Sequence, residues 1–234
     1  MAMEFLDQGR QDCLPTKLTT ASELLADCAS AHKSQIQSSA LSTPSLRQTI
    51  TPASEWMAWL NKVSWVFAYG SLIWNPEIPV LRGLQARVDG YHRRFCISST
   101  RYRGTPEEPG VVLGLDRGGC CHGMVWELTP GQEALALEKL WAREMRNGAY
   151  HPRLLKLRLR CGAKVDALGF VAKREHPSYL RLSEVDLIKR LACCKGDRGS
   201  NMDYLAHTVG ALKKHGIADH GLLYLLEQVQ RGKG

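Results

Sequence analysis

Short runs of apolar residues, bounded by glycine or alternating with polar residues, fill the middle of the chain. The run 65–69 ends at Gly70, and Leu155, Leu157 and Leu159 alternate with lysine and arginine. A period of two gives a strand one buried face and one solvated face. Strands are therefore predicted at residues 65–69, 84–90, 91–98, 111–115, 123–128, 154–160 and 165–171.

Helical periodicity and capping residues replace this pattern toward the C-terminus. Ser183 and Asp219 are the expected N-caps of two helices, and Gly148 and Gly216 are expected to end two others. Because strands dominate the middle and helices the end, an α+β fold is favoured over a repeating βαβ order. The predicted helices cover residues 130–146, 183–196, 201–215 and the chain after Asp219, with a brief additional helix at 55–62.

The first 60 residues differ in composition from the rest. Between residues 30 and 54, ten of 25 are serine or threonine and two are proline. Such a stretch buries too little apolar surface to offset the entropy lost on ordering. We therefore expect residues 1–60 to be a flexible extension, in which 22–28 could form a short helix, and residues 61–234 to form the folded domain.

Charge and cysteine content narrow the classes of protein and partner. The 31 lysines and arginines against 23 acidic residues give a net charge of +8, which favours nucleic acid, anionic lipid or a small anionic substrate. No apolar run approaches the roughly 18 residues of a membrane-spanning helix. The cysteines lack a C-x-x-C pair, and His122 beside Cys120 and Cys121 lacks a second ligand pair, so no metal site is predicted. Without an apparent signal peptide, reduced thiols and a cytoplasmic location are expected.

The predicted strand at 65–69 runs into a glycine turn with the sequence Phe67-Ala68-Tyr69-Gly70-Ser71-Leu72-Ile73. Gly70 lets the backbone approach a ligand because it has no Cβ. Consecutive amide groups in such a turn can converge on an anion, and a carboxylate would suit them. An ordinary turn after a strand is the alternative, and this motif alone does not decide between the two.

Glu144 lies inside the apolar stripe of the helix predicted at 130–146. It follows Leu140 by four residues and Trp141 by three, so it shares their face rather than the solvated one. Burial there raises the pKa of a carboxyl group, and the negative end of the helix dipole acts in the same direction. A carboxylate with a raised pKa is a suitable general base or acid near neutral pH. Alternatively, Glu144 reaches past the helix end and pairs with Arg143, Arg146 or Arg153.

Two further regions could contribute to a binding site. The loop 101–110 is rich in glycine and proline, and either Arg101 or Arg103 could hold a substrate carboxylate. An exposed basic loop is the alternative. Tyr204, in the segment 200–205, could belong to the core or could point its hydroxyl group into a pocket.

Several motifs follow one another in order along the chain: Tyr69-Gly70-Ser71-Leu72, the strand 90–96, the loop 99–110, the run 113–119, Arg143-Glu144-Met145 with Gly148 and Tyr150, and the segment 200–205. Taken together, these motifs resemble the ChaC family of glutathione-specific γ-glutamylcyclotransferases over about residues 64–230. Ala68 stands where the family usually has glycine, and His207 stands where it usually has asparagine.

The resemblance implies a small, mostly antiparallel β-barrel with surrounding helices. It also implies that the α-amine of the γ-glutamyl group of glutathione attacks its own γ-carbonyl, which gives 5-oxoproline and releases Cys-Gly. Glu144 would act as general base and then as general acid, without a metal or other cofactor. The substrate would be bound by Ala68, Tyr69, Gly70, Ser71, Leu72, Ile73, Arg101, Tyr150 and Tyr204.

Two other functions stay open at this point. One is a cyclotransferase for other γ-glutamyl amino acids or amines, and the other is a basic binding module, for nucleic acid or as a regulator of ion transport. Against nucleic acid, the basic residues alternate with apolar ones and lack interleaved aromatic residues. Glutathione carries two carboxylates, so a basic pocket for it would account for the net charge without a nucleic-acid or membrane partner.

Overall fold

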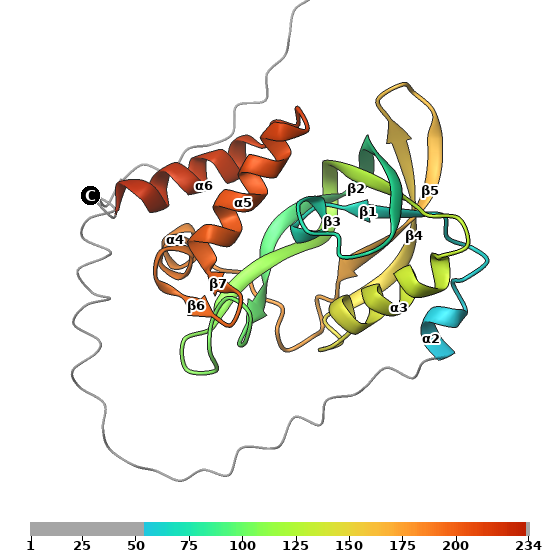
Figure 1. Cartoon of the computed structure of the whole chain (residues 1–234). Coiled ribbons are helices and arrows are strands. Elements are labelled where there is room, and N and C mark those ends of the chain that lie inside the picture. The colour runs from blue at the N-terminus through green and yellow to red at the C-terminus, as the bar shows by residue number, and fades with distance from the viewer. Residues whose placement is uncertain (1–53, 233–234) are drawn as a thin grey trace, which may run out of the picture.

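The computed structural model describes residues 54–232, which form a closed β-barrel with helices on two sides (Figure 1). The predicted helix at 22–28 and most of the predicted extension lie outside the described residues. The barrel strands are β1 (Trp65–Ala68), β2 (Val80–Ser99), β3 (Gly110–Leu128), β4 (Tyr150–Leu159) and β5 (Lys164–Ala172).

The strands are arranged around the barrel in the order β1-β3-β2-β4-β5, and β5 closes it. Most neighbouring pairs are antiparallel, whereas β5 makes short parallel contacts with β1 and β3. The expected α+β fold with a small, mostly antiparallel barrel is therefore confirmed. A closed barrel leaves no long unpaired strand edge, which stabilises a sheet of this size.

The two longest strands each join two of the predicted strands. β2 runs through Gly90 and β3 runs through Gly118 and Gly119, and these glycines have positive φ angles of 82°, 103° and 67°. The β2–β3 register shifts between Asp89 and Tyr91, so Gly90 bends β2 as a bulge without ending it. The predicted breaks at residue 90 and between residues 115 and 123 are therefore wrong, because a glycine interrupts the pattern whether a strand ends or bends.

The helices are α2 (Ser54–Met57), the 3-10 helix η2 (Ser71–Ile73), α3 (Glu133–Glu144), α4 (Glu184–Cys193), α5 (Asn201–Lys214) and α6 (His220–Arg231). The two predicted N-caps are confirmed. Ser183 accepts a hydrogen bond from the Asp186 amide at 3.1 Å, and Asp219 accepts one from the Leu222 amide at 3.0 Å. These bonds satisfy amide groups that have no partner within a helix.

Three predicted helices are longer than the helices in the structure. The helix predicted to end at residue 196 ends at Cys193, because Lys195 and Gly196 pair with Ser200 and Gly199 in a short hairpin. The helix predicted at 55–62 is limited to α2, and turns follow it. The helix predicted from residue 130 begins at Glu133, because Gly131 has a φ of 79°, outside the right-handed helical region. That helix, α3, ends at Glu144, so this residue lies at the junction between a helix and the chain leading into β4.

The helices form two groups around the barrel. α4, α5 and α6 pack on one another, and α4 and α5 contact β3, whereas α2 packs against α3 (Figure 1). A minimal hairpin of β6 (Lys195–Gly196) and β7 (Gly199–Ser200) connects α4 to α5. The η2 turn contacts α5 directly. The turn that follows β1 is therefore held between the barrel and the C-terminal helices.

The barrel interior and the inner face of α3 form one apolar core. Leu155, Leu157 and Leu159 of β4 are buried while the intervening basic residues are exposed, which confirms the predicted solvated strand face. Leu137 and Leu140 of α3 are fully buried in the same core. Within residues 54–232, no helix is both long enough and apolar enough to cross a membrane.

Asn201 joins α5 to β3 through a fully buried pair of hydrogen bonds. Its side-chain Nδ2 donates to the Val111 carbonyl at 2.5 Å, and its Oδ1 accepts from the Val111 amide at 2.8 Å. One amide side chain thus satisfies both backbone groups of a barrel residue. The position of α5 relative to the barrel depends on this contact.

We expect Asn201→Ala to lower the free energy of unfolding by roughly 2–4 kcal/mol, because it leaves a buried amide and a buried carbonyl of Val111 without partners. Chemical denaturation followed by circular dichroism measures the change. The exposed Gln230 of α6 offers a control, and Gln230→Ala should alter the same quantity by less than about 0.5 kcal/mol. Equal effects of the two substitutions would show that the Val111 contact does not stabilise the fold.

Candidate active site

The glycine turn after β1 leads directly into η2. The Ile73 amide donates to the Gly70 carbonyl at 2.9 Å, so the amides of Ser71 and Leu72 precede the first hydrogen bond of the turn and have no partner inside it. A Cβ on Gly70 would lie 3.1 Å from the Tyr204 hydroxyl oxygen. Glycine therefore lets the backbone approach this hydroxyl group closely.

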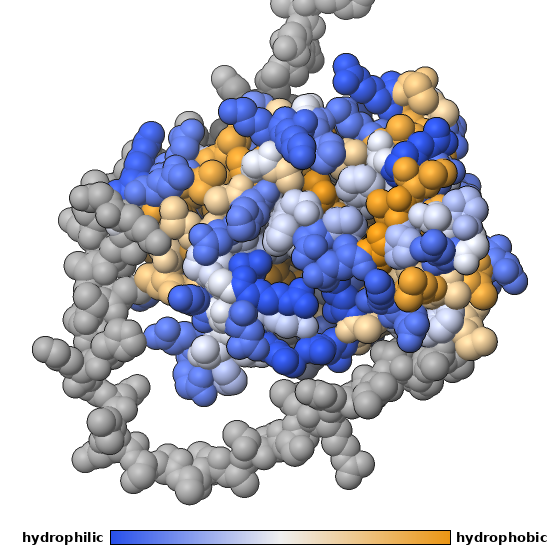
Figure 2. All heavy atoms as spheres, in the orientation of Figure 1, coloured by the Kyte–Doolittle hydropathy of each residue, from blue (hydrophilic) through white to orange (hydrophobic). Residues whose placement is uncertain are grey.

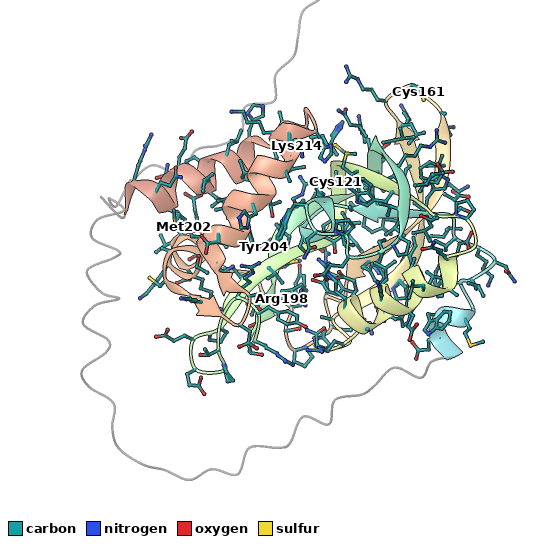
Figure 3. The ribbon with its side chains drawn as sticks, viewed as in Figure 1. Cys121, Cys161, Arg198, Met202, Tyr204 and Lys214 are labelled. Carbon is teal, nitrogen blue, oxygen red and sulfur yellow. The ribbon has the colours of Figure 1, made fainter. Side chains whose placement is uncertain are left out.

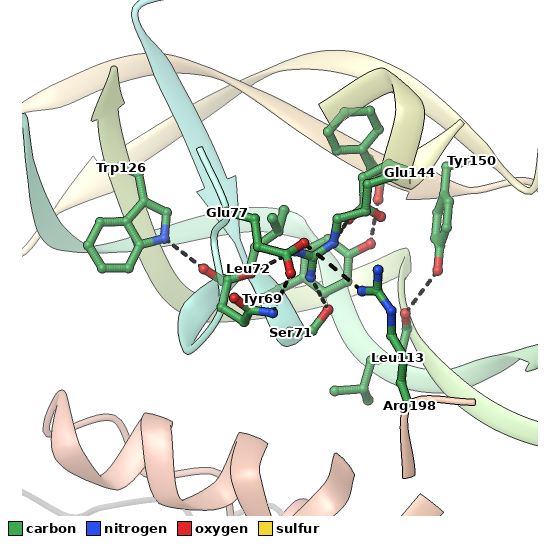
Figure 4. Close-up of polar contacts among 12 residues, drawn as sticks. Tyr69, Ser71, Leu72, Glu77, Leu113, Trp126, Glu144, Tyr150 and Arg198 are labelled. Atoms are coloured by element: carbon green, nitrogen blue, oxygen red, sulfur yellow. Dashed lines mark hydrogen bonds and ion pairs between the residues drawn. The ribbon is translucent and has the colours of Figure 1, made fainter. Parts of the chain in front are cut away.

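Contacts from the barrel hold this turn in place. The Trp126 indole nitrogen donates to the Leu72 carbonyl at 2.9 Å, and the Tyr69 hydroxyl donates to the Phe170 carbonyl at 2.7 Å (Figure 4). The guanidinium group of Arg93 donates to the Tyr69 carbonyl. These bonds come from three different strands, so the turn has a fixed position at the end of the barrel.

Glu144 is the last residue of α3, and its side chain is 15% exposed. Burial raises its pKa above the ordinary value, while the neighbouring Arg143 charge opposes this shift. The Arg143 Nε atom lies 3.1 Å from Glu144 Oε1. The sequence left open whether Glu144 is buried on the apolar face of its helix or pairs with a nearby arginine. In the structure it does both, because it lies on the buried side of α3 and also pairs with Arg143.

Arg143 connects this carboxylate to the glycine turn. Its Nη2 donates to the Ser71 hydroxyl oxygen at 2.7 Å, and its Nη1 donates to the Asn75 carbonyl at 2.6 Å and approaches Glu77 Oε2 at 3.2 Å. Figure 4 shows Glu144, Ser71 and Glu77 gathered around these contacts. The sequence predicts Arg143 as one possible ion-pair partner of Glu144, but spacing along one helix does not show which loop a long side chain reaches.

Three buried tyrosines lie close enough to Glu144 to sense its charge. Burial is the main cause that raises the pKa of Tyr69, Tyr150 and Tyr204, in the last case to about 12, and the Glu144 carboxylate adds to the shift in each. The Tyr150 hydroxyl donates to the Leu113 carbonyl at 3.2 Å, and the Tyr204 hydroxyl accepts from the Leu113 amide at 3.4 Å. All three phenols therefore stay neutral at physiological pH.

The loop 101–110 packs against the start of α5. Arg103 is buried, with its guanidinium 5.2 Å from the Tyr204 ring centroid and a hydrogen bond to the Ser200 carbonyl at 3.2 Å. Arg101 is exposed and pairs with Asp197 at 3.1 Å. The structure therefore brings Tyr69 to Ile73, Glu144, Tyr150 and Tyr204 together, and it places Arg101 on the surrounding surface.

Ala68 and Ile73 are both buried and form part of the wall behind the turn. Within the described residues, no group of three or more histidine, cysteine, aspartate or glutamate side chains is arranged to hold a metal ion. The polar groups of the site are the carboxylates of Glu144 and Glu77, the Arg143 guanidinium, the Ser71 hydroxyl, three phenols and the amides of the turn.

Comparisons with known proteins point to a single family. A family model described as ChaC-like protein matches residues 64–232. The glutathione-specific gamma-glutamylcyclotransferase of Escherichia coli K12 is 36% identical over 168 residues, which cover 71% of this chain and 73% of that protein. Human glutathione-specific gamma-glutamylcyclotransferase 1 is 31% identical over 176 residues, covering 72% of this chain and 79% of its own length.

A solved structure has a similar fold. The crystal structure of the selenomethionine-labelled gamma-glutamylcyclotransferase specific to glutathione from yeast matches with a TM-score of 0.67 and 24% identity. The match covers 72% of this chain and 96% of the yeast chain. This likeness supports the barrel architecture described above.

Proposed function

The chain belongs to the ChaC-like family, and from this membership we propose that it is a glutathione-specific γ-glutamylcyclotransferase with Glu144 as its general base and acid. The observation that supports this most directly is the buried Glu144 carboxylate, joined through Arg143 to the Ser71 hydroxyl of the glycine turn. A proton acceptor and an anion-binding turn thus lie side by side.

The reaction forms a five-membered lactam within the substrate. The α-amine of the γ-glutamyl group attacks the γ-carbonyl carbon, the bond to the cysteine nitrogen breaks, and 5-oxoproline and Cys-Gly result. Because the attack is intramolecular, the protein mainly has to hold the glutamyl chain in a folded conformation, and orientation of this kind can supply a large rate factor. The conversion needs no oxidant, reductant or added group.

Glu144 accepts the proton that the attacking amine must lose, and then returns a proton to the departing cysteine nitrogen. One carboxylate can perform both steps when its pKa lies closer to neutral pH than usual. Burial at the end of α3 raises the pKa of Glu144 in that direction. The Arg143 contact keeps the carboxylate oriented while leaving Oε2 available for the substrate.

The glycine turn holds the glutamyl moiety. We assign the α-carboxylate to the amides of Gly70, Ser71 and Leu72, since the Ile73 amide is already bonded inside the turn. The Tyr204 hydroxyl accepts a hydrogen bond from Leu113, so its own proton can be donated to the substrate.

The remaining predicted residues surround the bound substrate. Tyr69 and Tyr150, both buried, flank Glu144 and keep water away from the reacting atoms. Ala68 and Ile73 form the apolar side of the site. Arg101 is exposed at the edge of the site, where the Cys-Gly part of the tripeptide would extend.

Product analysis tests this function. Incubation of the full chain with glutathione should yield 5-oxoproline and Cys-Gly in equal amounts, as measured by mass spectrometry. A parallel incubation with γ-glutamyl-alanine distinguishes a general γ-glutamylcyclotransferase from a glutathione-specific one. Absence of 5-oxoproline from both substrates would reject the proposal.

We also propose that residues 61–234 form the catalytic domain and that the residues before Ser54 are not needed for turnover, whereas Trp59 packs against Trp141 of α3. A chain that begins at Ser54 should keep its kcat/KM for glutathione within about threefold of the full-length value, because the site residues all lie after that position. A truncated chain that stays folded by circular dichroism but has lost its activity would contradict this division.

A further inference from the structure

Three guanidinium groups surround the ring of Tyr102 beside the proposed active site. The Arg198 guanidinium lies 4.4 Å from the ring centroid, and those of Arg101 and Arg146 each lie 5.8 Å from it. Figure 2 shows hydrophilic side chains gathered over the middle of this face, and Figure 3 places Arg198 in the same region, near Tyr204. The proposed reaction steps make no use of Tyr102 or Arg198.

The position of Arg198 is set by the backbone. Arg198 lies in the turn between β6 and β7, and its amide donates to the Tyr102 carbonyl at 3.0 Å. The Asp197 amide donates in the same way to the Arg101 carbonyl at 2.8 Å. A Cβ on Gly196 would overlap this second carbonyl, so the turn and the loop are packed as closely as their backbones allow. The Arg198 side chain therefore starts from a fixed point.

One carboxylate oxygen connects this cluster to the proposed catalytic groups. Glu77 Oε2 lies 3.2 Å from Arg143 Nη1 and 4.0 Å from Arg198 Nη1 (Figure 4). Arg143 in turn contacts Glu144, and the Arg198 charge lowers the pKa of Glu144. Arg198 is thus a neighbour of the reacting carboxylate as well as of the surface loop.

The charges of the cluster are only partly balanced. Asp197 pairs with Arg101, while Glu77 is shared between Arg143 and Arg198 and approaches Arg198 only at the limit of an ion pair. The Arg198 side chain is 45% exposed, so its remaining donors can reach a ligand. A planar guanidinium held over an aromatic ring, with donors free at its edge, suits a carboxylate better than it suits an uncharged group.

We propose that Arg198, positioned over Tyr102, binds the C-terminal glycine carboxylate of the tripeptide substrate. Two residues of extended peptide span roughly 7 Å, which is the length between the γ-carbonyl carbon and that carboxylate. Arg198 is connected to Glu144 through Glu77 and Arg143, so the two groups belong to one continuous set of charged contacts. The assignment rests on the proposed function, and it names the group by which the chain distinguishes the tripeptide from a shorter γ-glutamyl compound.

The test compares glutathione with its C-terminal amide, γ-glutamyl-cysteinyl-glycinamide, which lacks only the negative charge. The wild-type chain should show a kcat/KM roughly ten- to hundredfold lower for the amide than for glutathione. Arg198→Gln should lower the value for glutathione by a similar factor, mainly through KM, and should change the value for the amide by less than about twofold. Arg82→Gln is a matched control, since Arg82 also pairs with a glutamate and lies over an aromatic ring on the surface of the barrel.

Two outcomes would overturn the proposal. Equal kcat/KM values of the wild-type chain for glutathione and for the amide would overturn it, and this result does not depend on whether Arg198→Gln folds. An equal loss for both substrates in a folded Arg198→Gln chain would mean that Arg198 acts on Glu144 or on the fold and not on the glycine carboxylate. Calorimetric titration of both compounds into Glu144→Gln keeps this test separate from the proposed function, because a charge-dependent difference in Kd is measured even if the wild-type chain turns over neither.

Discussion

Replacing Glu144 with glutamine is expected to lower kcat for glutathione at least about a hundredfold, because general acid–base catalysis commonly contributes a factor of that size or more. Glutamine has nearly the volume of glutamate, and its amide oxygen can still accept the hydrogen bond from Arg143 Nε. It cannot accept a proton from the attacking amine at neutral pH. Steady-state measurement of 5-oxoproline formation at saturating glutathione gives the change in kcat.

Folding and substrate binding should survive this substitution. Glu138 lies on the exposed face of the same helix, so Glu138→Gln makes the same chemical change away from the site and should leave kcat unaltered. Thermal unfolding of both variants checks that α3 is intact. If folded Glu144→Gln turned over glutathione at a wild-type rate, another group would have to carry the proton.

Patterns along the chain predicted the buried positions well. The alternation in β4 identified its solvated face, and the spacing from Leu140 and Trp141 placed Glu144 on the buried side of α3. The caps at Ser183 and Asp219 could be predicted because a capping side chain bonds to an amide only three residues away. Short-range rules of this kind depend on residues that are neighbours in sequence.

The long-range contacts of the site could not be predicted in this way. Arg93 donates to the Tyr69 carbonyl and pairs with Asp219, 126 residues further along the chain. Arg198 lies over Tyr102 because a turn and a loop that are distant in sequence meet beside the barrel. Periodicity shows which side of an element is buried but not which distant carbonyl or ring its side chains will meet. Closure of the barrel, likewise, was expected only from the family resemblance.

Arg143→Gln is expected to reduce kcat/KM at pH 7 by roughly tenfold or more and to move the acid limb of the pH profile to higher pH. Glu144 must be ionised to accept the proton of the amine, so activity falls as the pH drops through its pKa. Burial raises that pKa, and the Arg143 charge and hydrogen bond lower it. Removing Arg143 leaves burial opposed only by the weaker effect of the Arg198 charge, so the pKa of Glu144 rises further and a larger fraction of the carboxyl is protonated at pH 7.

The conservative variant separates this charge effect from the positioning of the turn. Arg143→Lys keeps a positive charge beside Glu144, so its acid limb should stay closer to that of the wild-type chain. A single ammonium group cannot reach Glu144, the Ser71 hydroxyl and the Asn75 carbonyl at once, as the guanidinium does, so kcat should still fall.

The loss of these partly buried hydrogen bonds should also lower the free energy of unfolding by about 1–3 kcal/mol in Arg143→Gln, which denaturation measures independently. A profile whose acid limb stays in place in folded Arg143→Gln would mean that Arg143 positions the turn without tuning the base, because the electrostatic effect alone requires the limb to move upward.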